Sequence, residues 1–154
     1  MLSEPQCLLH DFVEVARLSG FDIRPTAILH EVLPAPHRPR SLPRGKQAAY
    51  VFSLAPFGGT VLKVGKVGPE SNARFLSQHY NPNSSQSNLA KSLLQHPEVW
   101  GRLGIGALDE DTVGDWLKAH TARDHFYLDA GQSPFLLNLL EAFLHGRLDP
   151  LFEG

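Results

Sequence analysis

Residues 48–80 read AAYVFSLAPFGGTVLKVGKVGPESNARFLSQHY, and the other predicted elements can be placed around them. Residues 48–54 and 60–66 are rich in β-branched and aromatic side chains, and a PFGG turn at residues 56–59 separates them, which predicts a β-hairpin. Residues 70–78 then show a helical pattern. Five polar side chains of this hairpin and helix can converge at one end of a small sheet: Tyr50, Lys63, Lys66, Arg74 and His79.

The elements that follow extend the prediction to an α/β domain. Residues 89–120 add short helices, and residues 124–128 alternate between two kinds of side chain, as in a strand with two different faces. Residues 134–145 predict a strongly apolar helix that begins at a proline, which is favourable in a first turn. We therefore expect a small mixed or antiparallel sheet of three strands, flanked by helices: residues 49–54, 61–66 and 124–128.

The N-terminal part of the chain is expected to be a helical extension. Residues 5–18 predict a helix, and residues 26–32 a shorter one. Four prolines in residues 33–44 exclude a regular helix and predict an extended connector, whose basic side chains either contact phosphates or are simply solvated. The predicted division is residues 1–37 for the extension and the start of the connector, and residues 38–154 for the main domain.

Composition narrows the class of protein. The 154 residues suit one domain, and the formal charge of −2 argues against a protein held on nucleic acid by bulk electrostatics alone. The single cysteine, Cys7, excludes an internal disulfide and a cysteine-rich zinc site. Neither a long apolar run nor a signal-peptide pattern is present, so we expect a soluble, cytoplasmic protein without a membrane partner.

The order of three short motifs resembles the GIY-YIG nuclease domain. AAY at residues 48–50 and KVG at residues 63–65 stand where that family has two motifs on neighbouring strands, and Arg74 stands where an arginine follows on the first helix. Lys63 replaces the usual second tyrosine, as it does in some restriction-type members. His79 resembles the histidine that many members place on the same helix. The resemblance runs from about residue 48 to the C-terminus.

Phosphodiester cleavage requires the kinds of side chain that this resemblance brings together. The attacking water needs a base, and the phosphoryl group needs a cation beside it. Tyr50 has an ordinary pKa of about 10, so it needs nearby positive charge to act as a base, and Lys63 and Arg74 can supply that charge. The residues can also be read separately, with Tyr50 as a packed core residue and the cations as surface charges.

Glu141 lies in an otherwise apolar helix, where a lone carboxylate costs free energy unless it has a partner. The resemblance implies that this glutamate binds a divalent metal, and one carboxylate with waters and a phosphate suits Mg²⁺, or Mn²⁺ in its place. The alternative is a glutamate on the exposed edge of the helix. Three further residues are expected to contact the nucleic acid: Lys66, Asn88 and Lys91.

The sequence thus predicts a metal-dependent endonuclease that hydrolyses phosphodiester bonds in DNA. RNA as a substrate and a homodimer as the assembly stay open. The alternative is a nucleic-acid- or protein-binding module that has the fold without the chemistry. For the nuclease, we expect Tyr50, Lys63, Arg74 and Glu141 to line one concave surface, with His79 pointing towards Tyr50.

Overall fold

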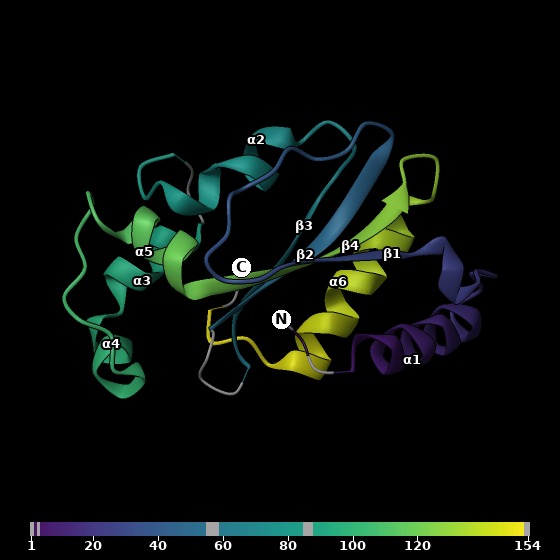
Figure 1. Cartoon of the computed structure of the whole chain (residues 1–154). Coiled ribbons are helices and arrows are strands. Elements are labelled where there is room, and N and C mark those ends of the chain that lie inside the picture. The colour runs from purple at the N-terminus through teal and green to yellow at the C-terminus, as the bar shows by residue number, and fades with distance from the viewer. Residues whose placement is uncertain (1, 3, 55–58, 85–87, 153–154) are drawn as a thin grey trace.

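The computed structural model describes residues 2, 4–54, 59–84 and 88–152, and shows an α/β fold built on one antiparallel sheet. The strand order is β1-β4-β2-β3 (Figure 1). The strands are β1 (Leu29–Leu33), β2 (Lys46–Leu54), β3 (Thr60–Val67) and β4 (Thr121–Asp129). The sheet therefore has four strands, and the prediction of three was one strand short.

One face of the sheet is covered by α1 (Pro5–Leu18) and α6 (Pro134–Leu148). Phe12 of α1 and Leu140 of α6 belong to the same buried cluster as Val51 of β2 and Phe126 of β4. Ser133 caps α6 by accepting a hydrogen bond from Phe135 N–H at 3.1 Å, and Pro134 fills a first-turn position that needs no amide proton. This apolar layer gives α6 a fixed position against the sheet.

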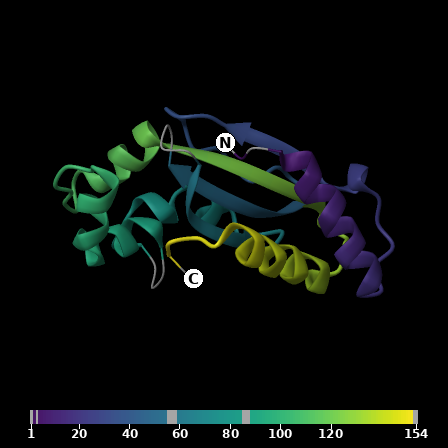
Figure 2. The same cartoon turned by 90° about the horizontal axis from the view of Figure 1, so that it is seen from below.

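The other face is covered by a series of short helices. These are α2 (Asn72–Leu76), the 3₁₀ turn η2 (Gln78–Tyr80), α3 (Leu89–Gln95), α4 (Pro97–Leu103) and α5 (Val113–His120). Figure 1 shows α2 and α6 on opposite sides of the sheet, and Figure 2 shows α3, α4 and α5 grouped at the end away from α1. Tyr50 and Phe52 of β2 belong to this second core, so alternate residues of β2 face different helical layers.

The N-terminal region differs from its prediction. Residues 26–32 were expected to be helical, but only the 3₁₀ turn η1 (Pro25–Ala27) precedes β1, which pairs with β4 along its whole length. A short apolar run such as this has no unique period, and pairing with a distant strand determined its structure. The proline-rich segment then crosses the α2 face, where His37 is buried and Leu42 N–H donates to Asn72 Oδ1 at 2.8 Å. The predicted turn at residues 56–59 lies, except for Gly59, outside the described residues.

The chain was expected to have no membrane partner, and the lengths and hydropathy of its helices bear on that expectation. In the described part of the chain, none of the helices has the length and apolar character needed to cross a bilayer.

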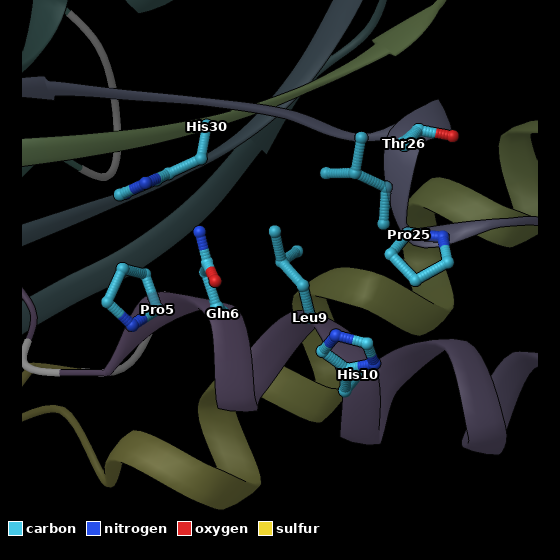
Figure 3. A pocket seen from close by; sticks show the side chains of 8 residues that line it. Pro5, Gln6, Leu9, His10, Pro25, Thr26 and His30 are labelled. Carbon is cyan, nitrogen blue, oxygen red and sulfur yellow. The ribbon is translucent and has the colours of Figure 1, made fainter.

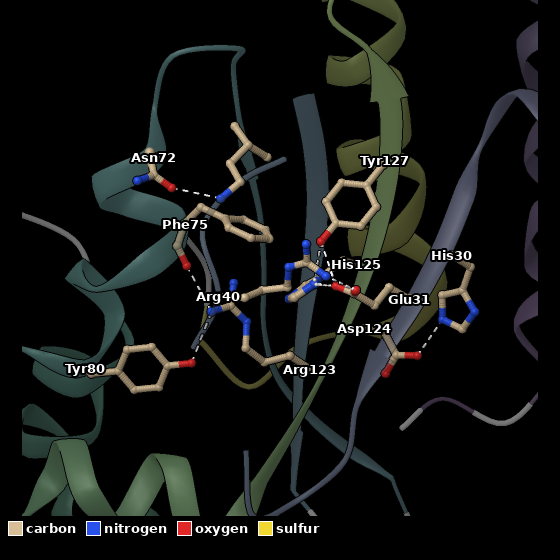
Figure 4. Close-up of polar contacts among 11 residues, drawn as sticks. His30, Glu31, Arg40, Asn72, Phe75, Tyr80, Arg123, Asp124, His125 and Tyr127 are labelled. Atoms are coloured by element: carbon tan, nitrogen blue, oxygen red, sulfur yellow. Dashed lines mark hydrogen bonds and ion pairs between the residues drawn. The ribbon is translucent and has the colours of Figure 1, made fainter. Parts of the chain in front are cut away.

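Strand β4 carries three consecutive charged or ionisable side chains that are fully buried: Arg123, Asp124 and His125. Asp124 faces the α1 layer and contacts His30 Nε2 at 2.7 Å (Figure 4). His125 faces the opposite layer, where Glu31 Oε1 accepts hydrogen bonds from His125 Nδ1 at 2.8 Å and from the Tyr127 hydroxyl at 2.7 Å. Burial, and then the charge of Arg123, lower the pKa of His125 to about 3, so its ring is neutral in the folded protein.

The neutral state of His125 predicts that acid destabilises the fold. Unfolding returns His125 towards its ordinary pKa of 6.5, so the unfolded chain binds an extra proton as the pH falls from about 6.5 towards 3, and stability drops over that range. The lowered pKa values of His37 and His79 act in the same direction. The free energy of unfolding, measured with urea, should fall as the pH is lowered from 7 to 5. His125→Gln should reduce the slope of this free energy against pH by up to about 1.4 kcal/mol per pH unit.

Phe12→Leu is the control for this measurement, because it weakens the core and leaves every titrating group in place. It should lower stability equally at each pH. A His125→Gln slope identical to that of the parent protein would contradict the assignment of a neutral, buried His125.

Candidate active site

Tyr50 lies at the centre of the site and depends on a glycine beside it. The two residues are directly opposite in the β2–β3 pairing, and a Cβ atom on Gly65 would lie 2.4 Å from the Tyr50 hydroxyl. Since real Cβ contacts are essentially never that short, only glycine allows the phenol ring to cross β3 at this point. Gly65 thereby permits a close approach to the backbone of β3. The group that approaches it is the ring of Tyr50.

His79 points at Tyr50, as expected, and its hydrogen bonds fix its tautomer. Leu89 N–H donates to His79 Nδ1 at 3.1 Å, so the proton of the neutral ring is on Nε2, which contacts the Tyr50 hydroxyl oxygen. Burial, followed by the charges of Arg74, Lys63 and Arg123, holds the pKa of His79 well below its ordinary value. His79 is therefore a neutral donor to the Tyr50 oxygen.

Arg74, on α2, is the partly exposed cation of the site. Burial raises the pKa of Tyr50 to about 12, while the positive charges of Arg74 and Arg123 and a hydrogen bond from Arg74 act to lower it. The Tyr50 hydroxyl is thus protonated at neutral pH. The donors around its oxygen are those that stabilise a phenolate once the proton has left.

Lys63 lies on the same face of the sheet as Tyr50, because it pairs with Phe52 in the regular part of the β2–β3 register, two residues along from the Tyr50–Gly65 pair. Its side chain is fully buried, and its Nζ has no hydrogen-bond partner within the described residues. Burial, and then the charge of Arg74, lower the pKa of Lys63 to about 8, against the opposing effect of Glu141. The C-terminal segment runs along this edge, where Phe152 N–H donates to the Leu62 carbonyl oxygen at 2.9 Å.

Glu141 approaches from the other side of the sheet. It lies on α6, with 26% of its side chain exposed, and its Oε1 is 3.6 Å from Lys66 Nζ, which also donates to Asn138 Oδ1 at 2.5 Å. The expectation that all four main residues line one concave face is therefore wrong in that form. The charge of Glu141 nevertheless acts to raise the pKa values of both Tyr50 and Lys63.

The ligand that this site offers to a hydrated divalent cation is a single carboxylate, that of Glu141. Over the ranges that the structure describes, there is no group of three or more His, Cys, Asp or Glu side chains able to hold a metal. Glu141 offers one hard, partly exposed carboxylate, which is how Mg²⁺ binds when waters and a substrate phosphate supply its other ligands. Lys66 competes for the same oxygen.

The three residues expected to contact nucleic acid lie in different environments. Lys66 is 39% exposed beside Glu141. Asn88 is buried, and its Oδ1 accepts a hydrogen bond from Lys91 N–H at 2.8 Å, so it caps α3. Lys91 is partly exposed in the first turn of that helix. Lys66 and Lys91 thus have surface from which to reach a phosphate, whereas Asn88 is used within the fold.

Sequence reasoning missed Arg123, whose guanidinium lies beneath Tyr50 and Phe75. Its carbon Cζ is 5.5 Å from the centroid of the Tyr50 ring and 4.8 Å from that of Phe75. The only signal in the sequence is that Arg123, His125 and Tyr127 occupy alternate positions of one strand and so share a face. That pattern does not reveal that helices cover the face.

A separate hollow of about 440 Å³ lies on the α1 side of the protein, away from Tyr50. Figure 3 shows Gln6, Leu9 and His10 of α1 on one side of it, with Pro25 of η1 and His30 of β1 on the other. None of the residues predicted for the site lines it.

Comparisons of the chain with protein-family models, with curated proteins and with solved structures found no match. The chemistry of the site must therefore be argued from its geometry. A phenol that contacts a neutral imidazole, with cations beside it and a carboxylate on the other side of the sheet, offers the kinds of group that phosphoryl transfer to water uses.

Proposed function

We propose that the protein is a metal-dependent endonuclease that hydrolyses phosphodiester bonds in DNA, as its resemblance to GIY-YIG nucleases implies. The observation that carries this proposal is the Tyr50–His79 pair beside Gly65, with the charges of Arg74, Lys63 and Glu141 acting on it. The strands β2 and β3 and the α2–η2 segment that follows them bring these groups together, and Glu141 comes from α6 near the end of the chain. A tyrosine that served only to fill the core would not require this set of donors and cations.

Tyr50 is the group proposed to take the proton of the attacking water. Its phenolate form would accept hydrogen bonds from His79 Nε2–H and from Arg74, both of which stabilise negative charge on the oxygen. Because the pKa of Tyr50 is about 12, only a small fraction is deprotonated at neutral pH, and the rate should rise with pH.

The cations have separate roles in this proposal. Arg74 is partly exposed and has the planar guanidinium suited to a two-point contact with the phosphate. Lys63 is fully buried and acts through its charge. Glu141 would hold the Mg²⁺, which would supply positive charge near the phosphoryl group and the leaving oxygen. Lys66 would release Glu141 and contact the backbone of the nucleic acid instead.

One observation favours the alternative, a binding module of the same fold. Tyr50 and Lys63 are fully buried and His79 is 1% exposed, whereas a phosphodiester must touch the groups that cleave it. A protein of this kind would bind nucleic acid or another protein through Lys66, Arg74 and Lys91, and it would need no metal.

A cleavage assay tests the two functions against each other. Supercoiled plasmid and labelled single- and double-stranded oligonucleotides are incubated with the parent protein at pH 7.5 and pH 9, with Mg²⁺, Mn²⁺ or EDTA. The nuclease predicts cleavage that requires metal and is faster at pH 9. Binding in a gel shift without cleavage under any of these conditions would establish the alternative.

His79→Ala should slow cleavage by about 100-fold, a typical effect of removing one positioned donor from developing negative charge. It should also lower stability by about 1–3 kcal/mol, because Leu89 N–H would lose its buried acceptor. Cleavage rates and urea unfolding of the variant provide the measurement.

The matched comparison is His120→Ala, which removes an exposed histidine at the end of α5. It should alter neither the cleavage rate nor the free energy of unfolding. Parent-like cleavage by His79→Ala would remove His79 from the mechanism.

A further inference from the structure

Arg123 is a buried cation whose role is not explained by the groups proposed to act in cleavage. It lies on the central strand β4, faces the α2 layer and is fully excluded from solvent. Among the described residues, no carboxylate forms an ion pair with it, and its Nε and Nη2 have no hydrogen-bond partner. A buried charge without a counter-ion is costly, so a residue that only fills space would be better as methionine or leucine.

Four aromatic rings surround the guanidinium. Cζ of Arg123 is 4.7 Å from the ring centroid of Phe52 and 6.0 Å from that of Tyr80, in addition to its contacts with Tyr50 and Phe75. Cation–π attraction of this kind is strongest where water is excluded. The rings come from β2 (Tyr50, Phe52), α2 (Phe75) and η2 (Tyr80), so the guanidinium lies where these three elements meet.

Two hydrogen bonds fix the orientation of the Arg123 guanidinium among these rings. Arg123 Nη1 donates to the Phe75 carbonyl oxygen at 2.9 Å and to the Tyr80 hydroxyl at 3.1 Å (Figure 4). His37 Nδ1–H donates to the Thr121 carbonyl oxygen at 2.7 Å, which leaves Nε2 as the acceptor for the Tyr80 hydroxyl proton. The Tyr80 oxygen therefore accepts from Arg123 and donates to His37, and each group has one role.

We infer that Arg123 is a positioning residue: it holds the α2–η2 segment against the sheet so that Arg74 and His79 face Tyr50. The Phe75 carbonyl immediately follows Arg74 in α2, and Tyr80 immediately follows His79 in η2. Arg123 thus binds the chain next to each of the two residues that contact the Tyr50 hydroxyl. Its charge also acts on the pKa values of Tyr50 and His79, together with the charges of Arg74, Lys63 and Glu141.

The primary test is the tautomer of His79, read from the ring ¹⁵N signals of the free protein. In the parent protein, Nδ1 should be unprotonated and Nε2 protonated, as two well-separated signals. Arg123→Met should average these signals, because η2 would no longer be fixed. Arg123→Lys keeps the charge but not the two-point contact, so it should restore the signature only in part. Phe12→Leu, which weakens the opposite core, should leave both signals unchanged.

The effect of Arg123 variants on cleavage rests on the proposed function, whereas their effect on the ¹⁵N signals of His79 does not. Arg123 has no exposed surface with which to touch DNA, so Arg123→Lys should lower kcat and leave KM nearly unchanged. Absence of cleavage by the parent protein would refute the nuclease and not the positioning role. A folded Arg123→Met protein with the parent His79 signals would overturn the positioning role.

Tyr80→Phe decides the question if Arg123→Met fails to fold. It removes the hydroxyl that accepts from Arg123 and donates to His37. The loss of these hydrogen bonds should speed amide exchange of Tyr80 by at least about fivefold relative to Phe12→Leu. Equal exchange in the two variants would show that Arg123 does not hold the segment.

Discussion

Gly65→Ala should abolish cleavage and destabilise the fold. The added methyl group would lie 2.4 Å from the Tyr50 hydroxyl oxygen and 2.5 Å from Cζ of the ring, so the ring has to move. A phenol packed between Phe52, Phe75 and His79 has no free space to enter. We expect a loss of about 1–3 kcal/mol, typical of overpacking in a core, together with loss of the Tyr50–His79 hydrogen bond.

Urea unfolding and the metal-dependent cleavage assay measure these two effects. Gly131→Ala is the matched control, because a Cβ at that position meets nothing within 4 Å, and both quantities should stay at the parent values. Gly65→Ala combined with Tyr50→Leu should recover stability but not cleavage, since the smaller side chain relieves the collision. A Gly65→Ala protein as stable as the parent would show that the ring does not need this space.

Glu141→Gln should abolish cleavage while DNA binding is retained. The amide has the size of the carboxylate but no charge, and even an outer-shell partner of a metal ligand typically accounts for 10–100-fold in affinity, so the rate should fall by at least about 100-fold. DNA binding through Lys66 and Arg74 should persist or become tighter, because Lys66 loses its ion pair and a negative charge near the phosphate has gone.

The comparison requires cleavage and gel-shift measurements at one salt concentration for the parent protein, Glu141→Gln and Glu110→Gln. Glu110 is exposed in the loop before α5, so its variant controls for the change in net charge. A binding module predicts no cleavage by any of the three proteins and little difference in their binding. Undiminished metal-dependent cleavage by Glu141→Gln would remove this residue from the metal site.

The elements with strong local patterns were predictable from the sequence. The N-terminal helix was expected at residues 5–18 and is found as Pro5–Leu18. The hairpin strands are longer than expected by two or three residues, and the strand expected at residues 124–128 is found as Thr121–Asp129. Strand β1 was missed because its short apolar run fits either a helix or a strand, and its partner is a strand near the other end of the chain. No pattern within residues 26–33 contains that information.

The sequence was enough to predict which residues make up most of the candidate site, but it predicted their arrangement in space less well. The order of Tyr50, Lys63, Arg74 and His79 placed them on the hairpin and the next helix, and the contact between His79 and Tyr50 is confirmed. Glu141 was placed on the wrong face because the sequence shows which side of α6 is apolar, but not which layer receives it. Arg123 escaped notice because the burial of an arginine depends on the helices packed over it.

The strand order has a consequence for how the chain folds. The hairpin of β2 and β3 can pair as soon as it is made. Among the described strands β1 pairs with β4 alone, and Glu31 and His125 are 94 positions apart. Closing so long a loop is slow, since its entropy is lost before the contacts are gained. During synthesis, β1 therefore stays unpaired, and the apolar face of α1 stays unpacked, until β4 and α6 have emerged from the ribosome. Folding on the ribosome should be late and cooperative, and nascent chains that end before β4 should be targets for chaperones.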